Sequence, residues 1–289
     1  MTKGLPGPWV DYEAADPTPW ANNQGIVKFI EFPVRIPAMS RRAFHLYWMK
    51  HHSPHVMNVT PFAQFMRKYA TAHVYPENVP GLPAHYRQTS HLEGAAEVWI
   101  NSLEEVGDWL GHPLYAELVQ PDEPRFIAQD GSVEVIVAKE ERLYEPGRDM
   151  TETGMTKVYL LVAKRPNLGH DAFHAAASDY GKQVLRRPAL RALLRKLVVS
   201  HKLREPGLEG FVPADIDAVF ELWFRSRKDI AAFYAEESFD EPLRRHEEQF
   251  FDAARIRAVV GKMLVIHDEF SFQPSTMQPL AFNWDDGPL

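Results

Sequence analysis

Apolar and polar residues alternate over short segments of this chain, a pattern typical of half-buried β-strands. The first such segment covers residues 26–32. A helix is predicted to follow from Arg41, because Ser40 is a suitable N-cap and aromatic side chains recur at helical spacing after it. Pro54 is expected to kink or end this helix, since proline lacks an amide proton and its ring crowds the preceding turn.

The same patterns divide the chain into two sets of elements with one order. In the first set, strands are predicted at 26–32, 65–75, 95–101 and 132–137, with helices after Ser40 and Ser102. In the second set, strands are predicted at 157–162, 193–203, 218–224 and 256–266, with helical segments at 171–186, 226–234 and 241–253. Each set therefore follows the order β-α-β-β-α-β of the ferredoxin-like fold, which predicts an α+β protein.

Sequence similarity between the two sets indicates two repeats of one unit. Residues 97–102 read Glu-Val-Trp-Ile-Asn-Ser, and residues 221–226, which lie 124 positions later, read Glu-Leu-Trp-Phe-Arg-Ser. His73 corresponds in the same way to His201. A ferredoxin-like sheet carries helices on one face only, so its other face must be buried. We therefore expect the two repeats to pack sheet to sheet, as a dimeric α+β barrel within one chain.

This interpretation divides the chain into five parts. They are an N-terminal arm (1–25), a first repeat (26–144), a linker (145–155), a second repeat (156–268) and a C-terminal tail (269–289). The arm and the tail both carry aromatic side chains, which are rare in free termini. We expect these segments to pack on the body or to join two chains as a homodimer.

Composition and charge narrow the class of protein. The net charge of −7 argues against nucleic acid or an anionic membrane as the main partner, because both require basic patches. The absence of cysteine excludes disulfides, thiolate nucleophiles and cysteine-bound metals. The first residues contain no apolar signal segment, and no stretch has the length of a spanning helix. A cytoplasmic protein is therefore expected.

Two segments resemble the EthD family. Residues 44–56 read Phe-His-Leu-Tyr-Trp-Met-Lys-His-His-Ser-Pro-His-Val, an aromatic helix that ends in His-x-Pro, and both Glu-x-Trp-x-x-Ser segments resemble the second marker of that family. The resemblance covers 26–144 well and 156–268 more weakly. It implies a dimeric α+β barrel that holds a small aromatic or polyketide-like molecule between sheet and helices. Proteins with this barrel include cyclases, dehydratases, lactone isomerases and cofactor-free monooxygenases, so the fold does not select one reaction.

Comparison of the repeats points to the first as the active one. His52 aligns with Gly181 and Tyr69 aligns with Leu197, so the second repeat lacks these polar groups. His52 is the candidate general acid or base, because imidazole titrates near neutral pH. The alternative is a histidine that is merely satisfied at a helix end. His73 shares a strand face with Tyr69, and both are candidates to hold a carbonyl or phenol oxygen, although the histidine retained in the second repeat also fits a structural role.

Other aromatic and imidazole side chains are candidates for substrate binding. They are Tyr47, Trp48, His51, His55, His85, His91 and Trp99. Trp99 returns as Trp223, which favours core packing for this residue. No cofactor is expected, because the chain has no glycine-rich nucleotide loop. No metal is expected either, because Pro54 disturbs the spacing of His51 and His55 and no zinc signature occurs.

These observations favour a cofactor-free lyase of the dehydratase or cyclase type that uses histidine acid–base chemistry on a small aromatic or polyketide-like compound. A cofactor-independent monooxygenase on a phenolic substrate is the first alternative, which oxygen consumption would distinguish. A non-catalytic binding module is the second, which a cavity too small for an aromatic ring would favour. A haem-binding variant is a further alternative, which an absorbance spectrum would test.

Overall fold

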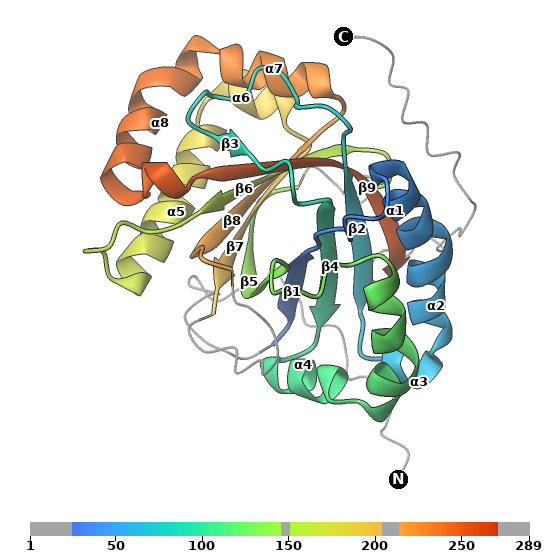
Figure 1. Cartoon of the computed structure of the whole chain (residues 1–289). Coiled ribbons are helices and arrows are strands. Elements are labelled where there is room, and N and C mark those ends of the chain that lie inside the picture. Colours follow the sequence, from blue (N-terminus) through green and yellow to red (C-terminus); the bar gives the residue numbers. More distant parts are fainter. Residues whose placement is uncertain (1–24, 146–150, 204–213, 271–289) are drawn as a thin grey trace.

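The computed structural model describes residues 25–145, 151–203 and 214–270. Helices surround an antiparallel sheet that is closed into a barrel (Figure 1). The predicted α+β class is thereby confirmed. The expectations for the N-terminal arm and for the tail, and for a homodimer formed through them, concern residues that lie almost entirely outside the described ranges.

Within the described residues, each half of the chain contributes four long strands in the same spatial order. In the N-terminal half, β1 (Val27–Phe32), β2 (Lys68–Val74), β4 (Gly94–Ile100) and β5 (Glu134–Tyr144) are arranged β2-β4-β1-β5. In the C-terminal half, β6 (Thr156–Val162), β7 (Lys196–Lys202), β8 (Ala218–Phe224) and β9 (Arg257–Asp268) are arranged β7-β8-β6-β9. Antiparallel pairing of β5 with β7 and of β2 with β9 closes the ring, and the short β3 (Arg87–Gln88) pairs with β9 in parallel.

Strand β5 is longer than the sequence pattern predicts. The predicted strand stops at Val137, whereas β5 continues to Tyr144. The added residues are charged and resemble a linker, but they pair with β7 along one edge of the barrel. Glu140 in this extension points into the barrel and contacts the buried Lys28. The two halves therefore belong to one continuous sheet, and each of the two pairings that join them contains a register shift.

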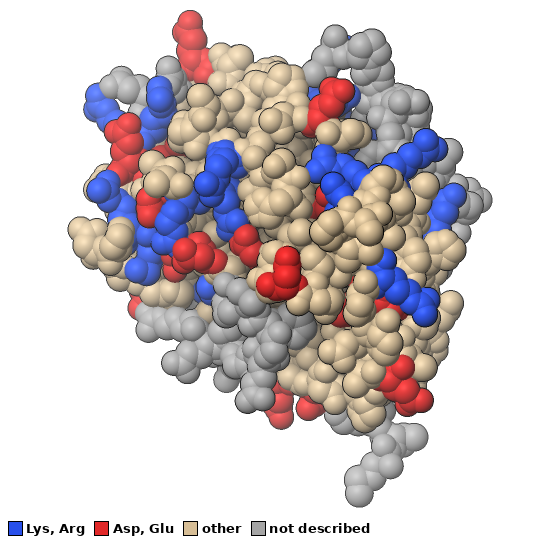
Figure 2. All heavy atoms as spheres, in the orientation of Figure 1, with Lys and Arg blue, Asp and Glu red and all other residues tan. Residues whose placement is uncertain are grey.

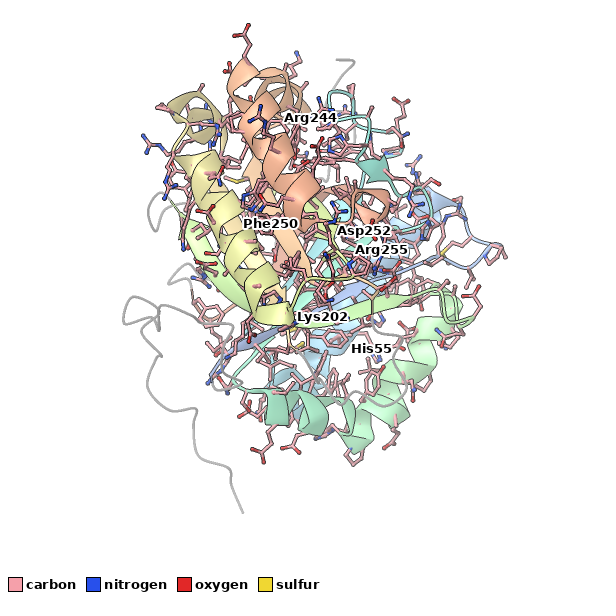
Figure 3. The ribbon with its side chains drawn as sticks, turned by 90° about the vertical axis from the view of Figure 1, so that its left-hand side faces the viewer. His55, Lys202, Arg244, Phe250, Asp252 and Arg255 are labelled. Atoms are coloured by element: carbon pink, nitrogen blue, oxygen red, sulfur yellow. The ribbon has the colours of Figure 1, made fainter. Side chains whose placement is uncertain are left out.

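Helices cover the outside of the barrel. Those of the N-terminal half are α1 (Arg41–Tyr47), the π-helix η3 (Trp48–His52), α2 (Ser53–Asn58), α3 (Thr60–Ala63), α4 (Leu103–Leu110), the π-helix η4 (Tyr115–Val119) and the 3-10 helix η5 (Gln120–Arg125). Those of the C-terminal half are α5 (His170–Leu185), α6 (Pro188–Leu193), α7 (Arg227–Ala235), α8 (Glu237–Phe250) and the 3-10 helix η6 (Ala253–Arg255). Figure 3 shows α5 and α8 side by side, with Phe250 at the end of α8 and His55 well apart from both.

Pro54 changes the helix that contains it without ending it. The helix begins where predicted, and the Ser40 side chain accepts a hydrogen bond from the amide of Ala43. The turn before Pro54 is the π-helix η3, and α2 continues directly from it. Proline cannot donate the usual helical hydrogen bond, and a π-turn accommodates such a local loss. Trp48 and His52, at the two ends of this wide turn, are both buried.

The glutamates of the two Glu-x-Trp-x-x-Ser segments lie inside the barrel. Glu97 and Glu221 contact Lys28 and Lys157, and these four residues with Glu140 form what we call the barrel ion cluster. Nζ of Lys157 lies 2.6 Å from Oε1 of Glu97 and 2.5 Å from Oε2 of Glu221. Although burial acts to raise the pKa of Glu97, the two lysines hold it at about 2. At Glu221 burial outweighs the same lysines and raises the pKa, so the cluster is a buried set of ionisable groups shared by both halves.

The tryptophans of these segments pack beneath the same lysines. Nζ of Lys28 lies 4.5 Å from the centre of the Trp99 ring, and Nζ of Lys157 lies 3.9 Å from that of Trp223. Both rings are buried within the barrel. Such cation–π contacts stabilise a desolvated ammonium group. Trp99 therefore lies inside the barrel and not on the outer face of the sheet, which the helices cover.

The serine of the first segment is expected to stabilise α4 as its N-cap. Oγ of Ser102 accepts a hydrogen bond from the amide of Glu105 at 3.2 Å. Ser102→Ala should lower the free energy of unfolding by about 1 kcal/mol, because that amide would lose its partner. Urea denaturation measures this change. Ser226→Ala, at the matching N-cap of α7, should lower stability in the same way. Unchanged urea midpoints in both variants would contradict the capping role.

The surface shows mixed charge. Acidic and basic side chains are interspersed on the face drawn in Figure 2. That face therefore has no extended area of a single charge sign of the kind that binds polyanions. As for membranes, none of the helices in the described part of the chain has both the length and the apolar character needed to cross one.

Candidate functional site

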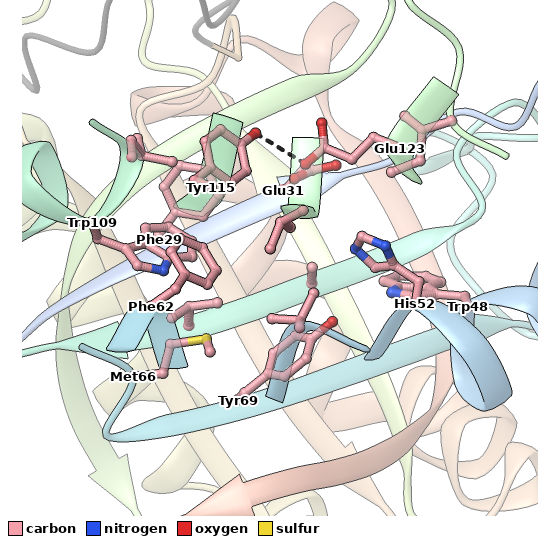
Figure 4. Close-up of a pocket in the computed structure, with 16 residues that line it drawn as sticks. Phe29, Glu31, Trp48, His52, Phe62, Met66, Tyr69, Trp109, Tyr115 and Glu123 are labelled. Atoms are coloured by element: carbon pink, nitrogen blue, oxygen red, sulfur yellow. Dashed lines mark hydrogen bonds between the residues drawn. The ribbon is translucent and has the colours of Figure 1, made fainter. Parts of the chain in front are cut away.

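A cavity lies between the sheet of the N-terminal half and the helices that cover it (Figure 4). It leaves about 60 Å³ for the centres of water-sized molecules, and about 590 Å³ of empty space when the solvent at its open mouth is counted. We call it the N-terminal cavity. Its walls are mainly apolar, and six aromatic side chains contribute to them: Phe29, Trp48, Phe62, Tyr69, Trp109 and Tyr115. Polar groups reach it from His52, Glu31 and Glu123. Few polar groups in an apolar hollow are typical of small-molecule sites.

His52 lines this cavity and is held from behind by Asp122. The Nδ1 atom of His52 lies 2.9 Å from Oδ2 of Asp122, whose other oxygen accepts a 2.6 Å hydrogen bond from the hydroxyl of Tyr47. Burial lowers the pKa of His52, and the opposing effect of Asp122 only partly offsets this. His52 is therefore neutral at pH 7. With Nδ1–H donating to the carboxylate, Nε2 is left as a proton acceptor.

Tyr69 brings a hydroxyl group to the same cavity from β2. Its oxygen lies 3.2 Å from Oγ of Ser53, which follows directly after His52 in the chain. Burial raises the pKa of Tyr69 to about 12, so the phenol remains a hydrogen-bond donor at neutral pH. Trp48 supplies an aromatic wall beside His52 (Figure 4).

Two carboxyl groups that the sequence analysis did not select also line the cavity. Glu31 extends from β1 and Glu123 from η5, and Figure 4 shows their side chains close together. Burial raises the pKa of Glu31 to about 8, and the charge of Glu123 adds to this effect. Burial likewise raises the pKa of Glu123 to about 7, although a 2.9 Å hydrogen bond from the hydroxyl of Tyr115 opposes it. These carboxyl groups can therefore carry a proton near neutral pH.

The signal for Glu31 was present in the strand pattern. Glu31 shares the outer face of β1 with Phe29, where period-two alternation predicts an apolar residue. A carboxyl group at an apolar position is costly unless it is paired or functional. Asp122 and Glu123 had no comparable signal, because they lie in an irregular proline-containing segment.

The C-terminal half has a smaller and more apolar cavity of about 260 Å³. The strand register matches Lys28 with Lys157, so Leu160 occupies the position of Glu31. Leu197 similarly occupies the position of Tyr69. Both leucines line this second cavity, as does Gly181, which aligns with His52. Three polar side chains of the N-terminal cavity, those of His52, Glu31 and Tyr69, are therefore absent from the second cavity.

His73 lies on the same strand face as Tyr69 but is not among the residues that line the cavity. Its ring packs 4.8 Å from that of Trp48, and its Nδ1 atom lies 3.1 Å from Nδ1 of His45. Oγ1 of Thr71 lies 3.0 Å from its Nε2 atom. The ring of Trp48, which does line the cavity, lies against His73.

Several other predicted binding residues lie outside the cavity lining. Tyr47 is behind Asp122, His51 is exposed beside Tyr47, and His55 places Nε2 2.7 Å from the carbonyl oxygen of Leu118. Trp99 is inside the barrel. His91 is exposed, and His85 binds Glu247 of the C-terminal half at 2.9 Å. Among the predicted site residues, the structure therefore brings His52, Tyr69 and Trp48 to one cavity.

A metal ion would need several converging ligands. Within the described ranges, no three histidine, cysteine, aspartate or glutamate side chains converge in a way that would hold a metal ion. The carboxyl groups of Glu31 and Glu123 thus have neighbouring phenol and aromatic groups instead of further metal ligands.

Comparisons with known proteins agree with this architecture. Residues 36–130 match the family model of the EthD domain. An anthrone oxidase-like protein superposes with a TM-score of 0.50 and 9% sequence identity, over 88% of this chain and 98% of that chain. A candidate monooxygenase from Lactobacillus acidophilus NCFM gives a TM-score of 0.46 at 8% identity, over 84% of this chain and 94% of its own. A mutant chlorite dismutase from Candidatus Nitrospira defluvii gives 0.42 at 13% identity, over 86% and 95%.

The likeness to the anthrone oxidase-like protein shows a common fold, and fold alone does not fix a reaction. Among curated protein sequences, none matches this chain significantly. The groups that line the cavity are therefore the basis for inferring function.

Proposed function

With an EthD domain at residues 36–130 as the premise, we propose that the N-terminal cavity catalyses proton transfer on a small aromatic or polyketide-like compound. One observation supports this above the others. His52 lines an apolar cavity as a neutral imidazole, while Asp122 binds its Nδ1 atom on the far side. A base that is oriented by a carboxylate and partly desolvated is suited to general acid–base catalysis.

The proposed step begins with a substrate carbon next to a carbonyl or phenol group. Nε2 of His52 takes a proton from this carbon, and the electron pair of the broken C–H bond moves toward the substrate oxygen. The hydroxyl of Tyr69 donates a hydrogen bond to that oxygen, where negative charge develops. Asp122 stabilises the imidazolium that forms. No cofactor is needed for this step.

The proton on His52 can then leave in two ways. Delivery to a hydroxyl leaving group completes a dehydration, which is the lyase reaction that we favour. Delivery to a carbon or oxygen after ring closure completes a cyclisation. In both cases the atoms and electrons balance without an external oxidant.

We further propose that the chain consists of two repeats, an active one at 26–144 and a mainly structural one at 156–268. The matching strand orders and the two Glu-x-Trp-x-x-Ser segments support this division. Leucines at 160 and 197 in the second cavity support the loss of chemistry there. A cytoplasmic location remains part of the proposal.

Oxygenation of a phenol is the main alternative for the same cavity. A carbanion formed by His52 would be the species that reacts with oxygen, so the first step is shared. Oxygen uptake during turnover separates the two reactions. A non-catalytic binding role would leave proton exchange at its uncatalysed rate.

The direct test is deuterium incorporation next to the carbonyl of 2-tetralone, followed by NMR in D₂O under argon. We expect the protein to accelerate this exchange, and Tyr69→Phe to lower the acceleration roughly 10²-fold, because the developing oxyanion loses a donor. Lys50→Ala, a change at an exposed position of η3, should retain the wild-type rate. An unaccelerated wild-type reaction would reject the proposal, and oxygen uptake in air would favour the oxygenase.

A further inference from the structure

Three groups in the N-terminal cavity have no role in the step described above. Glu31 and Glu123 adjoin each other at one side of the cavity, and Trp109 lies in another part of its wall (Figure 4). The proposed chemistry requires only His52, Asp122 and Tyr69. These additional polar groups are therefore candidates for a separate role in ligand binding.

The carboxyl pair gives the cavity a definite charge preference. Two adjoining carboxyl groups in an apolar site do not both ionise readily, so they titrate as a unit and retain one proton over an extended pH range. The raised pKa values of Glu31 and Glu123 agree with this. No lysine or arginine is found among the described residues that line the cavity. An anionic ligand would therefore meet negative charge without a compensating cation.

Trp109 provides a second and independent indication of a ligand. Its side chain is buried, with 6% exposed, yet its Nε1–H group has no hydrogen-bond partner within the described structure. An unsatisfied buried donor costs free energy, and native proteins seldom retain one without a reason. Figure 4 shows the indole nitrogen beside the ring of Phe29, and the atom itself is buried. An acceptor oxygen on a ligand would satisfy it.

The C-terminal half carries different groups at the same positions. Antiparallel bridges pair Arg35 with Ile127 and Lys164 with Phe251, which matches Glu123 with Glu247. Glu247 is saturated by donors, since it accepts hydrogen bonds from Tyr86, Tyr180 and His85. Glu123 has Tyr115 as its donor.

The other two groups of the N-terminal cavity are apolar in the C-terminal half. The helix caps match Trp109 with Phe233, which has no N–H group. Leu160 replaces Glu31. The N-terminal cavity therefore combines two carboxyl groups with a buried N–H group that has no hydrogen-bond partner in the described structure.

We propose that the N-terminal cavity selects an uncharged ring compound that carries hydroxyl or carbonyl oxygens and rejects the corresponding carboxylates. One ligand oxygen accepts a hydrogen bond from Nε1 of Trp109. A second oxygen exchanges hydrogen bonds with the proton-sharing pair Glu31 and Glu123. This inference deepens the proposed function, since it uses the same cavity, but it concerns binding and does not depend on turnover.

The test uses 2-naphthol and 2-naphthoate, two rings of similar shape that differ in charge, with the full-length protein at pH 7. Affinities are measured by calorimetry. We expect 2-naphthol to bind at least about tenfold more tightly, because the anion adds to the charge of the pair. The double variant Glu31→Gln with Glu123→Gln should reduce this preference to less than about threefold, since it keeps hydrogen bonding and removes the charge. Glu104→Gln, at an exposed position of α4, is the matched control and should keep the preference.

A second variant examines the donor separately. Trp109→Phe copies the residue of the C-terminal half and should weaken binding of 2,6-dihydroxynaphthalene about tenfold, because the second oxygen of this probe loses its hydrogen bond. Binding of 2-naphthol, whose single oxygen meets the carboxyl pair, should stay unchanged. Carbon-13 NMR of the glutamate carboxyl groups in the ligand-free protein should show that the pair retains one proton at pH 7. Glu123→Gln should lower the pKa of Glu31, because the charge of Glu123 adds to the effect of burial there.

Three outcomes of these experiments would contradict the proposed ligand class. Equal affinities of the two probes, failure of both to bind, or a fully ionised pair would overturn the inference. If that happened while 2-tetralone exchange persisted, the ligand class would be wrong and the proton chemistry would stand. If selective binding were found without exchange, the ligand class would stand and the proposed proton chemistry would be wrong.

Discussion

Replacing Lys157 by methionine is expected to lower the free energy of unfolding by about 3–5 kcal/mol, because the change leaves buried carboxylates without enough counter-charge. Lys157 contacts both Glu97 and Glu221 inside the barrel. Once it is removed, Lys28 is the only lysine left in the barrel ion cluster to balance three carboxylates. Water cannot replace the lost ammonium group, since both Lys157 and Glu97 are fully buried. Urea denaturation gives the change directly.

A paired variant separates lost charge from lost packing. Lys157→Met combined with Glu97→Gln removes one charge of each sign, while the amide oxygen can still accept the hydrogen bond from Tyr159. The pair should therefore be more stable than Lys157→Met alone. Lys228→Met, at an exposed position of α7, should change stability by less than about 0.5 kcal/mol. A single variant as stable as the wild type would show that the cluster does not hold the barrel together.

Replacing His52 by glutamine is expected to lower the rate of deuterium exchange at least about 10²-fold, because glutamine can hydrogen-bond but cannot accept a proton. The pH profile provides a separate check. Neutral imidazole is the active form, and burial lowers the pKa of His52 below its usual value of 6.5. The base therefore remains available as the pH falls through 6.5, and the rate should decline only at lower pH. Initial exchange rates of the wild-type protein, measured from pH 4 to 7, would show this decline.

Asp122→Asn tests the orienting role in the same assay. An amide at position 122 cannot stabilise the imidazolium, so the rate should fall while folding is retained. The fold decrease in exchange rate should exceed any fold decrease in the affinity for 2-naphthol, because Asp122 is not among the residues that line the cavity. Exchange that persists in His52→Gln with an unaltered pH profile would remove His52 from the mechanism.

Local sequence patterns were sufficient for most of the secondary structure. Alternation predicts β1 and β4, and the serines at 40 and 102 begin their helices as N-caps. These features depend on neighbours within a few residues, which is why a single sequence reveals them. The sequence pattern does not predict the charged end of β5, because this part of the strand depends on residues far away in the chain. Its strand character comes from pairing with β7, and Glu140 is charged because it reaches a lysine of another strand.

The candidate site was only partly accessible from sequence. His52, Tyr69 and Trp48 were selected by resemblance and by comparison of the repeats, and all three line the N-terminal cavity. His73 obeys the same strand periodicity as Tyr69, yet the ring of Trp48 packs between helix and strand at that point. Periodicity gives the face of a strand but not the side chain that covers it.

By itself, the sequence determined the α+β class, the order of the elements and the presence of related segments, because strand alternation, helix caps and recurring residues are local properties of the chain. The tertiary structure decided which charges are buried together and which groups share the cavity. Glu31 and Glu123 are far apart in the chain and meet only because β1 and η5 both border the N-terminal cavity, and their raised pKa values arise from burial and, for Glu31, from the charge of Glu123.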